Sequence, residues 1–231
     1  SYELAKQHNL FMGSRDVVRI RDLAFNVNQE LNIKERLVGS GAVDISDFDS
    51  IKDFLNKGND FLGSIDCVIS CVGSLMLKPT HLTKEEDLEN VFRVNVFSCF
   101  GILKHSFKFL KNNGGSLIFF SSAASKVGLK NHETISSAKA AVSSFVLSAA
   151  STYAKYNIRV NAIAPGLVET PLTERIVNNK LSMDYSKSLH GLNRIGKPEN
   201  FIPTINSLID QRSDWITGQT FFIDGGLSNV K

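Results

Sequence analysis

The sequence predicts one doubly wound α/β domain, with a mostly parallel sheet and helices on both faces. Apolar segments alternate with helical patterns along all 231 residues, which is typical of βαβ units. The apolar segments are short and rich in Ile, Val, Phe and Leu, as strands buried on both faces are. The chain contains no internal repeat, low-complexity tract or linker that would divide it. We therefore assign residues 1–231 to a single domain.

The expected strands follow from these apolar segments, and the expected helices from the longer stretches between them. The strands are expected at Asn9–Gly13, Gly41–Ile45, Ile65–Cys71, Ser116–Ser121, Ile158–Ala162 and Thr220–Ile223. The clearest helices are Lys84–Lys111 and Thr134–Tyr156, which are too long for strands and contain no proline.

Two segments depart from this regular alternation. Ser1–Gln7 has a helical pattern and leads directly into the first expected strand, whereas a doubly wound fold has a strand and a glycine-rich turn before that helix. We therefore expect roughly 15–25 residues before Ser1 that supply both. Pro171–Lys197 is polar and bounded by prolines. It follows a strand end, where ligands of such sheets bind, so it is either a substrate lid or a surface helical excursion.

Composition restricts the partners and the compartment. Hydrophobic residues make up 42% of the chain and the net charge is only +3, so we expect neither a nucleic-acid nor a membrane partner. No apolar run approaches the roughly 20 residues that span a bilayer. The three cysteines lie in apolar segments without the spacing of a metal site, which indicates buried, reduced thiols and a cytoplasmic protein: Cys67, Cys71 and Cys99.

Four motifs occur in a fixed order along the chain. Asn95 lies in the sequence Arg-Val-Asn-Val, and Ser121-Ser122 ends an expected strand. Ser-Ala-Lys-Ala-Ala-Val, which contains Lys139, begins a long helix, and Asn-Ala-Ile-Ala-Pro-Gly ends the next strand at Gly166. Together, in this order and spacing, the motifs resemble the classical short-chain dehydrogenase/reductases over essentially the whole chain. The resemblance implies a Rossmann-like fold, a nicotinamide cofactor and a site built from Asn, Ser, Tyr and Lys.

The resemblance assigns catalytic roles to Asn95, Ser122 and Lys139. In this family the Ser hydroxyl binds the substrate oxygen, the Asn supports a proton-relaying water, and the Lys holds the nicotinamide ribose. The Lys also lowers the Tyr pKa, which is ~10 when unperturbed. The chain departs from the family at Ile135, which occupies the tyrosine position four residues before Lys139 and has no proton to donate.

His132 is an alternative acid. It precedes Lys139 by seven residues, which is the tyrosine–lysine separation in the enoyl-reductase branch of the family, and an imidazole can act as an acid near neutral pH. The opposing interpretation is an ordinary surface histidine in a polar loop.

The resemblance also implies a set of cofactor-binding residues. Arg15 follows the strand end that contacts the adenosine ribose and suits a 2′-phosphate, so NADP(H) is expected, with NAD as the alternative. Gly73 allows a close backbone approach, although its motif has lost the usual asparagine. The complete expected set is Ser14, Arg15, Asp44, Ile45, Cys71, Val72, Gly73, Lys139, Pro165, Gly166, Val168 and Thr170.

These expectations lead to two functional hypotheses. The first is an NADP(H)-binding oxidoreductase that acts on a small carbonyl or alcohol, with atypical or reduced catalysis. The second is a non-catalytic subunit or regulator with the same fold. By analogy with the family, a homodimer or homotetramer is expected, and no metal is required.

Overall fold

The structure is a computed structural model that describes residues 2–31 and 37–230. Its strands are β1 (Leu10–Ser14), β2 (Val38–Ala42), β3 (Cys67–Ser70), β4 (Gly115–Phe120), β5 (Ile158–Pro165) and β6 (Thr220–Ile223). Its α-helices are α1 (Tyr2–Ala5), α2 (Val17–Leu31), α3 (Phe48–Leu62), α4 (Glu85–Phe92), α5 (Ser98–Leu110), α6 (Glu133–Tyr153), α7 (Glu174–Val177), α8 (Lys180–Leu189) and α9 (Ile202–Ile209).

All strand pairs in the described part of the chain are parallel. One sheet has the order β1-β2, and the other has the order β3-β4-β5-β6. In a 3-2-1-4-5-6 arrangement a further strand would lie between β1 and β3. The expected mixed α/β architecture is confirmed, while the sheet of the described residues is in two parts.

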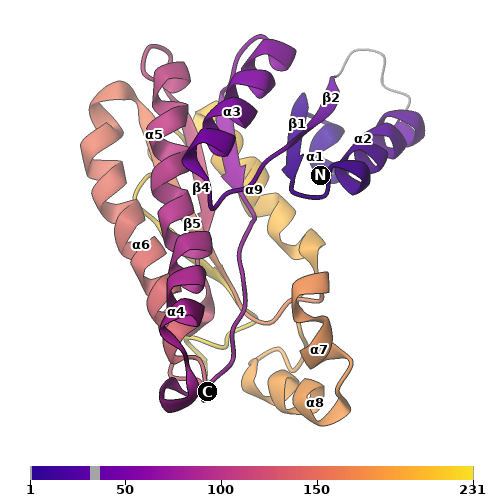
Figure 1. The fold of residues 1–231 in the computed structure, drawn as a ribbon, viewed down its shortest axis with the longest axis vertical. Coiled ribbons are helices and arrows are strands. Elements are labelled where there is room, and N and C mark those ends of the chain that lie inside the picture. Colours follow the sequence, from indigo (N-terminus) through magenta and orange to yellow (C-terminus); the bar gives the residue numbers. More distant parts are fainter. Residues whose placement is uncertain (1, 32–36, 231) are drawn as a thin grey trace.

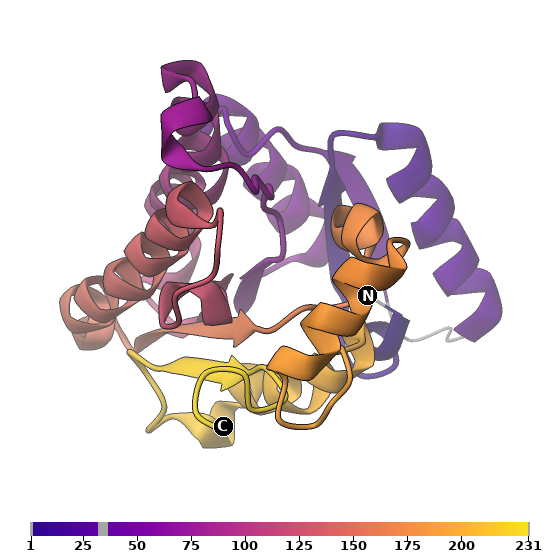
Figure 2. The same ribbon diagram turned by 90° about the horizontal axis from the view of Figure 1, so that it is seen from below.

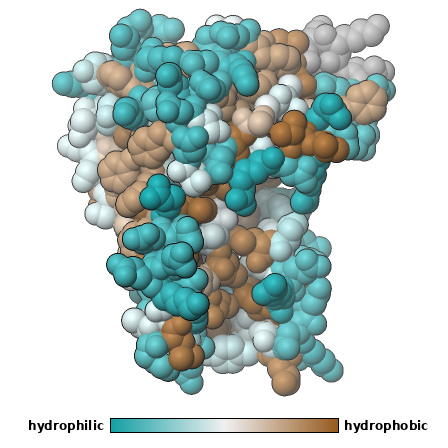
Figure 3. Space-filling model, viewed as in Figure 1, coloured by the Kyte–Doolittle hydropathy of each residue, from teal (hydrophilic) through white to brown (hydrophobic). Residues whose placement is uncertain are grey.

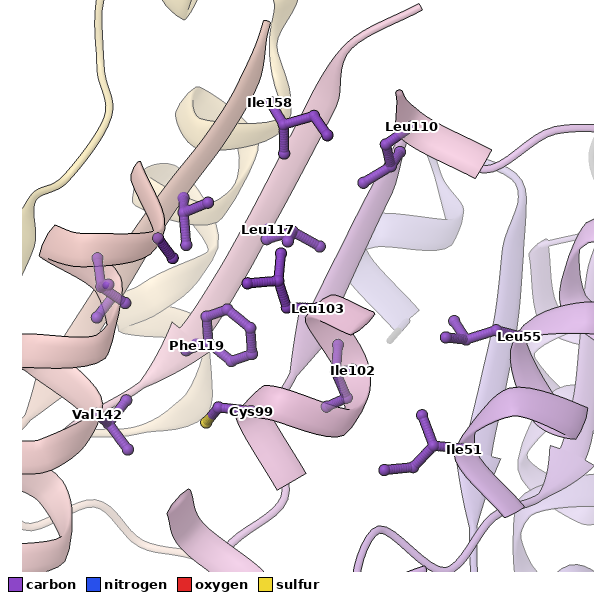
Figure 4. Packing of buried hydrophobic residues seen from close by; sticks show 14 of the residues in the cluster. Ile51, Leu55, Cys99, Ile102, Leu103, Leu110, Leu117, Phe119, Val142 and Ile158 are labelled. Carbon is purple, nitrogen blue, oxygen red and sulfur yellow. The ribbon is translucent and has the colours of Figure 1, made fainter. Parts of the chain in front are cut away.

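Helices cover both faces of the four-stranded sheet (Figure 1). On one face, α5 and α6 pack on β4 and β5 around Leu117 and Phe119, both almost completely buried, and α3 packs against α5, β1 and β2. Figure 4 shows this cluster, with α5 contributing Ile102 and Leu103 between the strands and α3. On the other face α9 packs on Ile118 and Ile163. The two central strands, β4 and β5, are therefore buried on both sides, as their uninterrupted apolar runs predicted.

The second expected strand is displaced from its predicted position. It forms at Val38–Ala42 and not at Gly41–Ile45. Aromatic rings lie against its glycines, and a methyl group added at Gly39 would lie 2.7 Å from the Phe61 ring. Val43 and Ile45 are buried after the strand ends, which explains their alternating pattern. Glycine is therefore used here for close packing rather than for a turn.

The predicted helix Lys84–Lys111 is not continuous. It comprises α4, a π-helical turn at Arg93–Phe97 and then α5. A π-helical turn inside an α-helix often occurs at a functional site. Asn95 lies in the centre of this turn, and its side-chain amide donates to Val91 O at 2.9 Å.

Candidate functional site

Three of the predicted residues meet at the end of β3. A methyl group added at Gly73 would lie 2.9 Å from Asn95 Oδ1 and 3.3 Å from Lys139 Nζ. Asn95 and Lys139 come from the π-helical turn and from α6, so three separate segments form this point. Any side chain at position 73 would fill it. The glycine therefore keeps open a small polar space in which the amide and the ammonium are adjacent.

Asn95 fixes the loop after β3 to the helical layer. Its side chain is 2% exposed, and its amide nitrogen donates to Ser74 Oγ at 2.8 Å. Its amide oxygen accepts from Ser74 N at 3.3 Å. Ser74 was not among the predicted residues, although a buried asparagine amide requires such partners. The loop conformation around Gly73 therefore depends on this pair.

Lys139 is a buried ammonium that is not paired with a carboxylate in the described part of the chain. Its Nζ donates to Phe120 O at 2.8 Å. Burial lowers the pKa of Lys139 to about 8, and the nearby Cys99 thiol slightly opposes this shift. An ammonium has three hydrogens to donate, and Phe120 O is the one acceptor observed among the described residues. The group is well placed to donate to ligand hydroxyls beside Gly73.

Ser121 and Ser122 have different environments at the end of β4. Ser121 is buried, and its hydroxyl donates to Lys139 O at 2.8 Å, so it holds the strand end against α6. Ser122 is partly exposed, and its Oγ accepts from Ala124 N at 3.2 Å. Its O–H hydrogen has no acceptor among the described hydrogen bonds. Ser122 is thus the more accessible of the two hydroxyls.

Ile135 lies one helical turn before Lys139 on α6 and is only 4% exposed. It packs in a small apolar cluster with Val91, Val96 and Ala138. The position expected for a proton donor is therefore filled by a tightly packed aliphatic side chain.

His132 lies immediately before α6 and is partly exposed. Its Nδ1 is 2.7 Å from Lys130 O, so this nitrogen carries a proton that it donates within the loop. Among the described hydrogen bonds, none joins His132 to Lys139. Its role as an acid stays a prediction.

The expected adenosine-binding residues gather where β1 and β2 end. Val43 N donates to Ser14 O at 3.0 Å, which brings Arg15 and Asp44 close together. Hydrogen bonds from Ser46 lower the pKa of Asp44, and the charge of Arg15 contributes to the same shift. Arg15 is exposed and available to an anion.

The remaining residues of the cofactor set differ in how accessible their side chains are. The side chain of Ile45 belongs to the core, so a ligand would meet its backbone at most. Cys71 and Val72 are exposed at the end of β3, which corrects the expectation that all three thiols are buried. Cys99 is buried, and burial raises its pKa to about 11.

The predicted nicotinamide side is the turn that follows β5. Val168 pairs with Gly196 in an isolated parallel bridge, and Gly196 N donates to Leu167 O at 2.8 Å. Thr170 Oγ1 lies 3.1 Å from Thr173 Oγ1 at the start of a short 3₁₀ turn. The turn is therefore attached to the far end of the Pro171–Lys197 segment. That segment forms α7 and α8, which lie at the lower end of the molecule in Figure 1.

Pro165 and Gly166 begin this turn at the carboxyl end of β5. Figure 2 looks onto this end of the molecule, where the α7–α8 segment lies beside the loop that follows β6. In the space-filling view, a recess with apolar side chains separates this segment from the α4 side (Figure 3). The predicted residues of β4, β5 and α6 thus lie toward one end of the sheet, as ligand sites of open α/β sheets do.

Two further findings concern membranes and metals. Among residues 2–31 and 37–230, no helix has the length and apolar character to cross a membrane. The same residues contain no group of three or more His, Cys, Asp or Glu side chains arranged to hold a metal ion.

Comparison with known proteins places this geometry in context. A family model described as enoyl-(acyl carrier protein) reductase matches residues 20–228. The 3-oxoacyl-[acyl-carrier-protein] reductase of Chlamydia pneumoniae is 31% identical over 204 residues, covering 84% of this chain and 80% of that protein. The reductase of the same name from Thermotoga maritima is 32% identical over 186 residues, covering 80% and 75% respectively.

Solved structures share the fold. A gluconate 5-dehydrogenase from Burkholderia cenocepacia, in complex with NADP and tartrate, superposes with a TM-score of 0.89 at 21% identity. The match covers 96% of this chain and 86% of that one. A putative short-chain alcohol dehydrogenase from Sinorhizobium meliloti gives a TM-score of 0.92 at 21% identity, covering 100% and 90%.

Proposed function

This chain belongs to the short-chain dehydrogenase/reductase family, and from that premise we propose that it binds NADP(H) and acts on a small carbonyl or alcohol with reduced catalysis. The observation that carries the proposal is the space beside Gly73, where Lys139 lies next to Asn95 and has N–H donors without an acceptor among the described residues. Ribose hydroxyls are suitable acceptors for those donors. The exposed Arg15 beside Asp44 supports a 2′-phosphate on the cofactor.

The side chains of the site could perform some steps of such a reaction but not all of them. NADPH would supply the hydride for carbonyl reduction. Lys139 would hold the ribose, and the Ser122 hydroxyl would donate to the substrate oxygen. Ile135 contributes no proton, so the developing alkoxide must take one from water or from a weaker donor. General acid catalysis typically contributes 10²–10⁴-fold to the rate. We therefore expect turnover to be lower by about that factor than in a reductase that has a tyrosine at this position.

The binding part of the proposal is tested by calorimetric titration with NADPH. We expect a saturable signal from the unmutated protein and much weaker binding by Lys139→Met. Lys155→Met is the matched control, because Lys155 is exposed beyond the end of α6. The absence of both a calorimetric signal and thermal stabilisation at millimolar NADPH would overturn this proposal.

A second candidate function is a non-catalytic subunit or regulator that uses the same fold. The close packing of Ile135 with Val91, Val96 and Ala138 favours it, because the proton-donor position is part of the core. The two functions differ in one measurement. With NADPH bound, a reductase oxidises it when a carbonyl substrate is added, and a regulator does not. A panel of small ketones and 3-oxoacyl thioesters, followed at the NADPH absorbance, separates them.

A further inference from the structure

His190 connects the α7–α8 segment to the turn after β5. It follows the last residue of α8 and is only 5% exposed. Its Nε2 lies 3.1 Å from Leu167 N, and its Nδ1 lies 2.7 Å from Ser186 O. Neither the sequence motifs nor the family resemblance assigned this histidine a role. It is separated from Leu167 by 23 residues of sequence.

The two partners determine which ring nitrogen carries the proton. A backbone N–H can only donate, so Nε2 of His190 accepts from Leu167. A carbonyl can only accept, so Nδ1 carries the proton and donates to Ser186 O. The ring is therefore a neutral imidazole with both nitrogens used. The orientation of the ring is therefore fixed both by α8 and by the turn after β5.

The space around the ring is closed by glycines. A methyl group at Gly166 would lie 2.6 Å from His190 Nε2. A methyl group at Gly225, which has a φ of 61°, would lie 3.5 Å from Cδ2 of the same ring. Gly166 follows β5 and Gly225 follows β6, so the imidazole packs between two strand ends. A shift of the α8 end must therefore carry the ring with it and disturb the turn.

We propose that His190 is a positioning residue that couples α8 to the Pro165–Thr170 turn, so that cofactor binding at the turn and the position of α8 depend on each other. The inference rests on the proposed function, because it takes this turn as the nicotinamide side of the site. The Leu167 peptide is the point of contact. Its N–H is bound by His190, and its carbonyl accepts from Gly196, at the far end of the same segment.

Two amide substitutions separate the two ring contacts. The longer side chain of the His190→Gln variant can place an acceptor near the position of Nε2, whereas His190→Asn can keep a donor near Nδ1 but does not reach Leu167. We expect NADPH affinity to be near normal in His190→Gln and about tenfold weaker in His190→Asn and His190→Ala, the scale of losing one hydrogen bond. His81→Ala is the control, because His81 is exposed and lies outside this site.

Amide hydrogen exchange measured by NMR gives a second readout that does not require activity. In the unmutated protein, NADPH should slow exchange at Leu167 and along α8, and in His190→Asn it should slow neither. A side chain that only fills space would not produce this difference between two amides of similar polarity. Equal NADPH affinity in all variants, or an equal loss in His190→Gln and His190→Asn, would overturn the inference.

The experiment also distinguishes this inference from the proposed function. If the unmutated protein does not bind NADPH, the proposed function fails. Amide hydrogen exchange measured without NADPH then tests whether His190 couples α8 to the turn. Faster exchange of both the Leu167 amide and the α8 amides in His190→Asn than in His190→Gln supports it, and identical exchange in the two variants refutes it.

Discussion

Replacing Ile135 with tyrosine tests whether the proton donor is the only missing part of the site. Position 135 lies four residues before Lys139 on α6, and side chains with this spacing are neighbours on one helix face. A hydroxyl there would lie near an ammonium, which lowers the pKa of a phenol. We expect Ile135→Tyr to raise kcat/KM on a simple ketone by about 10²–10⁴-fold, the usual contribution of a positioned acid.

The same substitution should reduce stability. Ile135 is 4% exposed and packs against Val91, Val96 and Ala138, so a larger ring overfills this cluster. Overpacking of a well-packed core typically costs about 1–3 kcal/mol. Chemical denaturation measures this loss, and NADPH oxidation with a panel of ketones measures the gain in activity.

Ile135→Phe is the matched control for both effects. It adds the same ring without the hydroxyl, so it should share the loss of stability and show no gain in activity. Adding Lys139→Met to Ile135→Tyr should remove most of the gain. If the Tyr and Phe variants are both folded, bind NADPH and have equal rates, the assignment of position 135 as the vacant acid position is wrong.

Three further predictions concern the cofactor site. Arg15→Ala should reduce the preference for NADPH over NADH by about 1 kcal/mol in calorimetric titration, because Arg15 is exposed and its charge is partly screened. Arg19→Ala is the control. Equal affinities for the two cofactors in the unmutated protein would contradict a role of Arg15 in binding the 2′-phosphate. Gly73→Ala should weaken NADPH binding at least tenfold by filling the polar space, whereas Gly128→Ala, which has open space around it, should not; equal affinities of the two variants would contradict this. Lys139→Met should increase the free energy of unfolding of the unliganded protein at pH 7. This gain should shrink by about 1 kcal/mol by pH 9, since the Lys139 ammonium loses its proton near pH 8 in the folded protein and near pH 10.5 in the unfolded chain. A stability difference between the two proteins that is constant with pH would refute this prediction.

The strands and the site were not equally predictable from the sequence. Thr220–Ile223 was predicted to the residue, and β4 was displaced by one residue, because each is a short apolar run bounded by turn residues. The π-helical turn around Asn95 was not predicted, and neither were the hydrogen bonds that join its Asn95 side chain to Ser74. A local sequence pattern gives no information about hydrogen-bond partners that lie 21 residues away.

The residues of the candidate site were also only partly predictable from the sequence. The order of motifs was sufficient to select Gly73, Asn95 and Lys139, which the structure brings together. His190 escaped detection because nothing in the sequence around it differs from an ordinary helix end. Its partner Leu167 lies on a different segment, and only the fold shows that both ring nitrogens are used.

Lys139 indicates that ligand binding and proton transfer are separable in this chain. Its pKa of about 8, against an ordinary 10.5, corresponds to about 3 kcal/mol of disfavoured charge in the folded protein. One carbonyl bond, from Phe120, does not offset a cost of this size. The remaining N–H donors lie beside Gly73, where the absence of a side chain leaves room for a ligand. A bound ribose would compensate this cost with or without a tyrosine at position 135. Under the proposed function, a chain without a proton donor at position 135 would lack one step of the chemistry and would still have a use for a buried ammonium at this place.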